Sequence, residues 1–182
     1  MNFQEIAKER FSCRKYDTER AVEPEKIRAI LDSVTLAPSA CNSQPYLITV
    51  CRGECVKQLA RAKNASSEGI NDFVADADTV LVISEQPVIV SPVMEERMAN
   101  QNFRDIDIGI AAAYITAEAA AQGLGSCIVG LFDDMGVRKV CGLDTPVRLL
   151  ITIGYERAGT VRREKRRKSA ETLFRFVGQE TK

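Results

Sequence analysis

The chain has 182 residues, of which 45% are hydrophobic and 27% charged, a composition typical of a folded globular domain. Lysine plus arginine and aspartate plus glutamate both total 25, so the zero net charge gives no overall attraction to nucleic acid or anionic membranes. Histidine is absent, which excludes Ser-His-Asp triads, Cys-His pairs and histidine-ligated zinc or haem. An enzyme built from this sequence would therefore depend on a cofactor or on carboxylates.

The N-terminal third predicts two helices separated by a basic segment. The first helix is expected over residues 2–9, and an irregular basic segment follows over 10–17. The second helix should begin near Pro24, which suits the first helical position, and end before Pro38. Its apolar face is formed by Ile27, Ile30, Leu31 and Val34, which recur at helical spacing.

The remaining chain mixes strands and helices. Strands are predicted over 46–51, 79–84, 126–131 and 147–155, helices over 54–64, 105–122 and 134–141, a loop or lid over 85–93, and a short helical or extended piece over 171–176. The helix over 105–122 is apolar on most faces, which predicts burial in the core or at a subunit interface. Long helices come in pairs, so the fold class is α+β. Gly123 and Gly125 follow a helix, which is the wrong context for a dinucleotide fingerprint.

The cysteines and the apolar segments favour a reduced, cytoplasmic protein. Residues 1–10 lack the apolar run of a secretory signal, and the apolar stretch over 108–132 is interrupted by Thr116, Glu118 and Gln122, so no membrane span is predicted. The six cysteines, which include no CxxC pair, are Cys13, Cys41, Cys51, Cys55, Cys127 and Cys141. We interpret them as reduced thiols, and a disulfide-rich secreted domain is the weaker alternative.

Arg10, Ser12 and Arg14 alternate within the basic segment. In an extended chain, residues two apart point the same way, so two guanidinium groups and a hydroxyl would line one edge. Guanidinium groups match phosphate in a bidentate geometry. The alternative is a solvated basic segment that binds nothing.

A polar turn over 37–46 lies between the second helix and the first strand. Asn42 and Gln44 each offer an acceptor and two donors, which suits the edge of a flat heterocycle. Alternatively, these amides satisfy the backbone of their own loop.

Two further segments carry weaker signals. Glycines at both ends of 123–130 would let a ligand approach the backbone, or would simply end a helix and bend a strand. The basic run over 162–168 has no interleaved aromatic residues, so a nucleic-acid patch is a weak interpretation. A solvated connector that contributes to one phosphate site is the better hypothesis.

Taken in order, these motifs resemble the FMN-dependent nitroreductase family. The motifs are Arg-x-Ser-x-Arg-x-Tyr, Ala-Pro-Ser-x-x-Asn-x-Gln-Pro-Tyr, Gly-Leu-Gly-Ser-Cys-x-x-Gly, and Ile-Gly-Tyr with a basic tail, and the likeness runs over 8–176. The resemblance implies a single domain over 1–182 with a three-layer fold: a mixed, mostly antiparallel central sheet flanked by helices. It also implies a homodimer with FMN at the subunit interface.

The resemblance further implies the residues that would bind FMN. They are Arg10, Phe11, Ser12, Arg14, Pro38, Ser39, Ala40, Asn42, Gln44, Asn71, Ile128, Val129, Gly130, Arg166 and Lys168. Residues 38–40 would come from the other subunit, and the register of the tail is open by one residue. No side chain is expected to be catalytic, because flavin N5 is the reactive atom. Arg14 and the backbone near Val129 and Gly130 would tune it.

The implied reaction passes hydride from NAD(P)H through flavin N5 to a flat electrophile such as a nitroaromatic or a quinone. Alternatives are another reaction on the same fold (flavin fragmentation, dehalogenation or ene reduction) and FMN binding without turnover. Neither nucleic acid nor a metal is an expected partner. The chain departs from the family pattern at Cys41, where glycine is common, and no lysine closely follows Asn71.

Overall fold

A four-stranded sheet forms the centre of the computed structural model, which describes residues 1–62 and 69–178. The strands are β1 (Tyr46–Arg52), β2 (Thr79–Glu85), β3 (Gly125–Val129) and β4 (Val147–Gly154), in the spatial order β1-β2-β4-β3. The helices are α1 (Phe3–Glu9), α2 (Pro24–Thr35), α3 (Glu54–Arg61), α4 (Pro92–Met98), α5 (Phe103–Ala121), α6 (Asp134–Cys141) and α7 (Ala170–Leu173), with short 3-10 turns η1 (Ala40–Asn42) and η2 (Asp72–Asp76).

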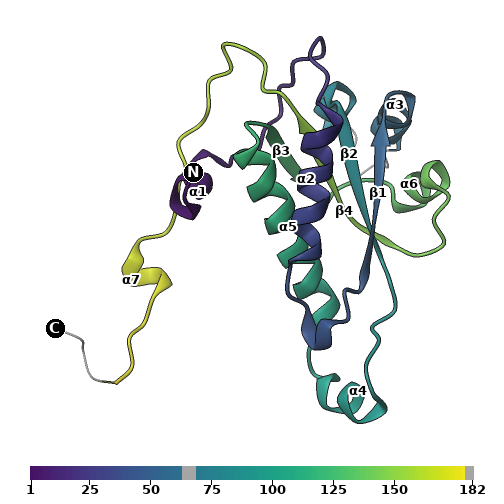
Figure 1. The fold of residues 1–182 in the computed structure, drawn as a ribbon, viewed down its shortest axis with the longest axis vertical. Coiled ribbons are helices and arrows are strands. Elements are labelled where there is room, and N and C mark those ends of the chain that lie inside the picture. Colours follow the sequence, from purple (N-terminus) through teal and green to yellow (C-terminus); the bar gives the residue numbers. More distant parts are fainter. Residues whose placement is uncertain (63–68, 179–182) are drawn as a thin grey trace.

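Helices cover both faces of this sheet, which gives three layers (Figure 1). Leu81 and Ile83 of β2 pack with the apolar faces of α2 and α5, whereas Val80 and Val82 pack with α3 and α6. Because both faces of β2 are buried, its sequence is continuously apolar instead of alternating. The predicted α+β, three-layer fold is confirmed. The described strands pair antiparallel throughout, and their one parallel contact is a bridge from Ser12 to Ser126.

Most predicted elements are confirmed to within a few residues, and α6 has the predicted bounds. The helix predicted over 54–64 ends at Arg61, and Asn64 lies outside the described residues. The loop predicted over 85–93 is wrong at both ends, because Glu85 belongs to β2 and α4 begins at Pro92. Proline at the first helical position, preceded by a serine cap, starts that helix; the prediction treated the same proline as a loop residue.

Helix α5 is buried on one side only. Its residues Ala111, Ile115 and Ala119 pack in the core beside α2, whereas Ile106 and Tyr114 are exposed on the opposite side. This helix and the others in the described parts of the chain lack the length and hydropathy needed to cross a bilayer. The exposed side of α5 is therefore an apolar surface that the single chain does not cover.

The basic segment after α1 lies across the β3–β4 edge of the sheet. Cys13 N donates to Ser126 O at 2.9 Å, and the buried Tyr16 hydroxyl bonds Thr152 Oγ1 at 2.7 Å. Two strand glycines make this close approach possible. A Cβ at Gly125 would lie 2.7 Å from Cys13 Cβ, and one at Gly154 would lie 2.8 Å from Tyr16 Cδ1. Both distances are shorter than carbon atoms in contact allow, so the segment can follow this path only where the strands carry glycine.

Gly125→Ala should therefore destabilise the fold. The added methyl group overpacks the contact with Cys13, and the free energy of unfolding should fall by about 1–3 kcal/mol in a denaturant titration. Cys13→Gly removes the two atoms that lie closer than 3 Å to the new methyl group. The two substitutions should therefore be less harmful together than the sum of their separate effects. Strict additivity would show that the close approach does not explain Gly125.

Candidate functional site

The basic segment presents alternate residues to solvent at the sheet edge. Cys13 and Tyr16 are buried, whereas Ser12 and Arg14 are exposed and Arg10 is half-buried. The expected alternation of this segment therefore holds around Cys13. A hollow of about 550 Å³ opens beside it. The residues that line the hollow are Arg10, Phe11, Ser12, Arg14, Lys15 and residues 160–167 of the tail.

The C-terminal tail forms the other wall of this basic hollow and is fixed by contacts with α1 and with Glu156, which follows β4. The Arg162 guanidinium contacts Glu9 at 3.0 Å and Glu156 at 2.9 Å, and it lies 4.0 Å from the centre of the Phe11 ring. Lys165 Nζ donates to the carbonyl oxygens of residues 7 and 8 at the end of α1. The predicted connector is thus an ordered wall of the hollow.

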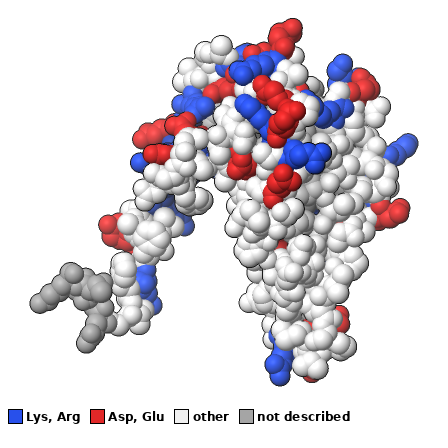
Figure 2. Space-filling view, in the orientation of Figure 1, with Lys and Arg blue, Asp and Glu red and all other residues white. Residues whose placement is uncertain are grey.

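Positive charge accumulates in the basic hollow. Partial burial lowers the pKa of Lys165, and the neighbouring charges of Arg10 and Arg167 lower it further. Among the described residues, Arg10 and Arg14 have no carboxylate partner within ion-pairing distance. Figure 2 shows basic and acidic side chains interspersed along the upper part of the molecule and down the tail, whereas the residues that line the hollow are mostly basic. An anion bound here would relieve the repulsion, so the hollow suits a phosphate group.

The polar turn lies elsewhere and has a strained backbone. Cys41, Asn42 and Gln44 have φ of 51°, 52° and 45°, in the left-handed region that glycine tolerates best. A glycine at the position of Cys41 would adopt this conformation without strain. The buried Asp107 carboxylate of α5 accepts from Ala40 N at 3.1 Å and so holds the turn in place. Strain maintained by surrounding contacts is frequent at functional sites.

The two amides of the turn are bonded to each other. Gln44 Nε2 donates to Asn42 O at 2.9 Å and to Asn42 Oδ1 at 3.0 Å, and Gln44 N donates to Ser39 Oγ at 3.0 Å. These bonds correspond to the alternative in which the loop satisfies its own polar groups. Asn42 Nδ2 and Gln44 Oε1 have no hydrogen-bond partner among the described residues and remain available to a ligand.

Asn71 lies close to the end of β3. It adopts a left-handed conformation, and its Nδ2 donates to Leu131 O at 3.1 Å. The Arg14 guanidinium lies 5.8 Å from the centre of the Phe73 ring, so the basic segment reaches the turn that Asn71 precedes. A Cβ at Gly130 would meet nothing within 4 Å. Packing within the chain therefore does not require glycine there, and the position is open to a ligand.

The predicted site residues fall into two groups at opposite edges of the sheet, one along β3 and the other beside the start of β1 (Figure 1). The first group contains Arg10, Phe11, Ser12, Arg14, Asn71, Ile128, Val129, Gly130 and Arg166. The second contains Pro38, Ser39, Ala40, Asn42 and Gln44, beside the start of β1. Helix α5 runs from the second group toward the first, and its 19 residues span about 28 Å. A single chain therefore does not bring the two groups together.

The structure indicates which tail residues line the hollow, and it adds two supporting residues that the sequence did not indicate. Arg166 lines the basic hollow, whereas Lys168 does not. Sequence reasoning did not identify Asp107 or Arg162, which fix the turn and the tail. The signal for Asp107 is a carboxylate within an otherwise apolar helix face, since such a group needs a buried partner. Arg162 gives no such signal, because its partner Glu9 is distant in sequence.

Comparison with known proteins relates this arrangement to one family. The family model described as "Nitroreductase family" matches residues 7–155. An oxygen-insensitive NADPH nitroreductase of Helicobacter acinonychis is 24% identical over 184 residues, which cover 83% of this chain and 86% of that protein. The structure of an FMN-dependent nitroreductase from Clostridium difficile R20291 is 26% identical, with a TM-score of 0.69 and 92% coverage of each chain. A nitroreductase family protein of Streptococcus pneumoniae TIGR4 shares the fold, with a TM-score of 0.80 at 21% identity, covering 97% of this chain and all of that one.

Proposed function

The chain belongs to the nitroreductase family of oxidoreductases, and on that premise we propose that it binds FMN and reduces a flat electrophile at the expense of NAD(P)H. The observation that carries the proposal is the basic hollow beside Arg10, Ser12 and Arg14. Nitroaromatic compounds and quinones are the acceptor classes. The whole chain over 1–182 would serve as one cofactor-binding unit in the cytoplasm.

The residues of the hollow fit the chemical groups of FMN. Arg10 and Arg166 would bind the phosphate, because both guanidinium groups line the hollow and lie among like charges. Ser12 would bind the ribityl chain. The open backbone around Val129 and Gly130 leaves room for a planar ring to approach closely. Lys168 lies outside the hollow and is not part of this proposal.

When bound, FMN would supply the redox chemistry, namely hydride acceptance from NAD(P)H and reduction of the acceptor. The chain supplies binding and electrostatics. Arg14 lines the hollow, and its guanidinium lies 5.8 Å from the centre of the Phe73 ring. A guanidinium there stabilises negative charge that develops on a ligand. The absence of histidine is consistent with a protein that holds its cofactor without moving protons itself.

A second copy of the chain would complete the site. The polar turn over 38–44 lies far from the basic hollow in one chain, so another chain must provide it to the same ligand. The exposed apolar side of α5, which includes Ile106, Ala113 and Tyr114, offers a self-complementary surface. Figure 2 shows a broad uncharged area over α2 and α5. We therefore propose a homodimer with two equivalent sites.

Anaerobic reduction of the purified protein tests the proposed function. The protein should be yellow, release FMN on denaturation, lose its flavin absorbance when NADH or NADPH is added, and recover it with a quinone or nitroaromatic compound. Protein that stays colourless after incubation with FMN would refute the cofactor assignment. Flavin that NAD(P)H does not bleach would refute the enzyme and leave only an FMN-binding protein.

Arg14→Ala should weaken FMN binding. Loss of a charge-assisted contact should weaken the binding free energy by about 1.5–3 kcal/mol. The dissociation constant, measured by quenching of FMN fluorescence, should therefore rise ~10- to 150-fold. Arg28→Ala is the matched control, because Arg28 is an exposed arginine on α2 and has no role in the site. Equal affinity in the Arg14 variant and this control would remove Arg14 from the site.

Ala113→Arg should convert the dimer to monomers. It places a charge on the exposed apolar side of α5, where burial against a second copy would leave it without a partner. Light scattering after size exclusion should report half the mass, and the monomers should retain little FMN. Gln58→Arg adds the same charge to an exposed position of α3 and should leave the mass unchanged. Dimers in both variants would place the interface elsewhere.

A further inference from the structure

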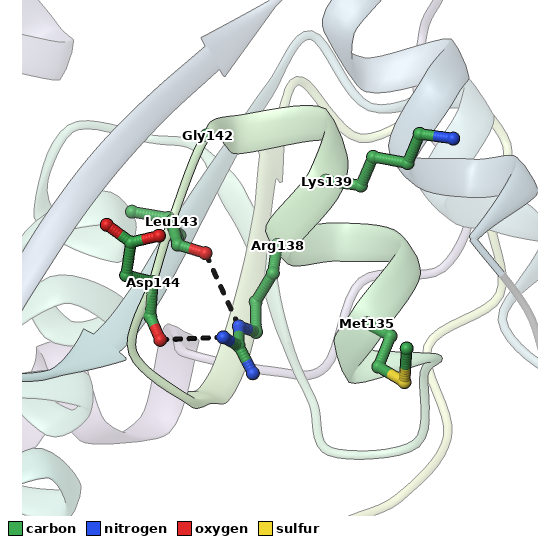
Figure 3. A pocket seen from close by; sticks show the side chains of 6 residues that line it. All are labelled: Met135, Arg138, Lys139, Gly142, Leu143 and Asp144. Atoms are coloured by element: carbon green, nitrogen blue, oxygen red, sulfur yellow. Dashed lines mark hydrogen bonds between the residues drawn. The ribbon is translucent and has the colours of Figure 1, made fainter.

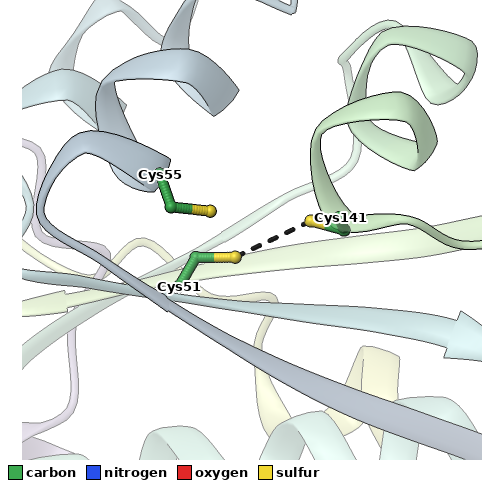
Figure 4. A group of neighbouring side chains, drawn as sticks. All are labelled: Cys51, Cys55 and Cys141. Carbon is green, nitrogen blue, oxygen red and sulfur yellow. Dashed lines mark hydrogen bonds between the residues drawn. The ribbon is translucent and has the colours of Figure 1, made fainter.

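Three of the six cysteines converge on one point away from the proposed FMN site (Figure 4). Cys51 lies in β1, Cys55 in the first turn of α3 and Cys141 at the end of α6. Their sulfur atoms all lie within 4.8 Å of one another, and Cys51 Sγ is 3.7 Å from Cys141 Sγ. Elements far apart in sequence thus present thiols to a common centre.

The spacing of the sulfur atoms matches that of a tetrahedral metal site. Zinc–thiolate bonds are about 2.3 Å long, so two thiolates at a tetrahedral angle lie about 3.8 Å apart. The 3.7 Å between Cys51 and Cys141 agrees with this value. Cys55 needs only a small side-chain adjustment to complete a three-sulfur face, because its sulfur already lies within 4.8 Å of both.

The surroundings of this cysteine cluster select a soft cation. Its neighbours in the core are the aliphatic residues Val56, Leu59, Val140 and Leu143. Within the described residues, no carboxylate joins the cluster, so hard cations such as magnesium and calcium lack suitable ligands. Three thiolates leave a net charge of −1 with zinc(II) and −2 with copper(I). An apolar site favours the smaller charge, and therefore zinc.

The backbone around the cysteine cluster is held in position before any ion binds. Arg138 of α6 donates to Asp144 O at 2.6 Å and to Leu143 O at 3.3 Å, and these bonds fix the turn after Cys141 (Figure 3). This arginine also lines a shallow hollow of about 470 Å³ at the end of α6. Cys51 is 3% exposed, whereas Cys55 and Cys141 are half-buried, so two of the three thiols are partly accessible to solvent.

We propose that Cys51, Cys55 and Cys141 bind one zinc(II) ion as thiolates, with water as the fourth ligand. Binding releases the three thiol protons and changes no oxidation state. The ion would tie β1, α3 and α6 together on one face of the sheet. No residue of the proposed FMN site takes part, so zinc content and flavin content are independent quantities.

Zinc titration of the full-length, reduced and chelator-treated protein tests the site. In competition with a chromophoric chelator, the chain should bind one zinc ion, and cobalt(II) should give the thiolate charge-transfer absorption of a tetrahedral site. Cys55→Ser and Cys141→Ser should each weaken binding by more than about 100-fold, since even outer-shell substitutions cost roughly 10- to 100-fold. Cys41→Ser is the matched control, because Cys41 is exposed and outside the cluster, and it should retain one ion.

Alkylation of the unmodified sequence keeps the test valid if a variant fails to fold. Bound zinc should protect Cys51, Cys55 and Cys141 from iodoacetamide, as read by peptide mass spectrometry, and should leave Cys41 reactive. Zinc lost equally from Cys41→Ser, or no protection of the three thiols, would overturn the proposal. Copper(I) bound in preference to zinc would overturn the assignment of the ion. A reduced protein that binds neither ion would overturn the site itself.

Discussion

The close approach of the segment over 10–17 to the β3–β4 edge is the contact on which the site depends. Gly125 and Gly154 leave space for Cys13 and Tyr16, whose burial turns Ser12 and Arg14 toward solvent. A basic segment without such anchors would be solvated and mobile. Here, the Tyr16 hydroxyl bonds Thr152 Oγ1 in the interior, so the arginines start from a fixed backbone. Preorganisation of this kind reduces the entropy lost when a ligand binds.

The sequence predicts the elements better than it predicts their assembly. The apolar periodicity of α2 and the buried run of β2 depend on local pattern, so both elements were predictable. Helix α4 was missed because proline is an ambiguous signal: it is typical of loops, but it is also favoured at the first position of a helix, as at Pro92. Only resemblance indicated that residues 38–44 and the basic segment belong to one site, and their separation in the chain explains why no local pattern could show it.

For the polar turn, the alternative interpretation describes contacts that the structure contains. Asn42 and Gln44 are bonded to each other, as expected for a loop that satisfies its own polar groups. However, Asp107 holds this loop in a left-handed backbone conformation that is unfavourable for a residue with a side chain, such as Cys41. The basic run over 162–168 is not a free connector, because part of it is held against α1. Arg162 forms ion pairs with Glu9 and Glu156, so specific carboxylates balance part of the positive charge of this run.

The contacts of the tail with α1 also set the order in which the molecule can be completed. Arg162 and Glu9 are 153 residues apart, and Lys165 and Lys8 are 157 residues apart, so both walls of the hollow require the two ends of the chain. The last strand of the described sheet, β4, ends at Gly154, so the sheet is complete before the tail begins. During synthesis from the N-terminus, the three layers can therefore assemble before the tail is made. Binding of the proposed cofactor would then follow synthesis of the tail.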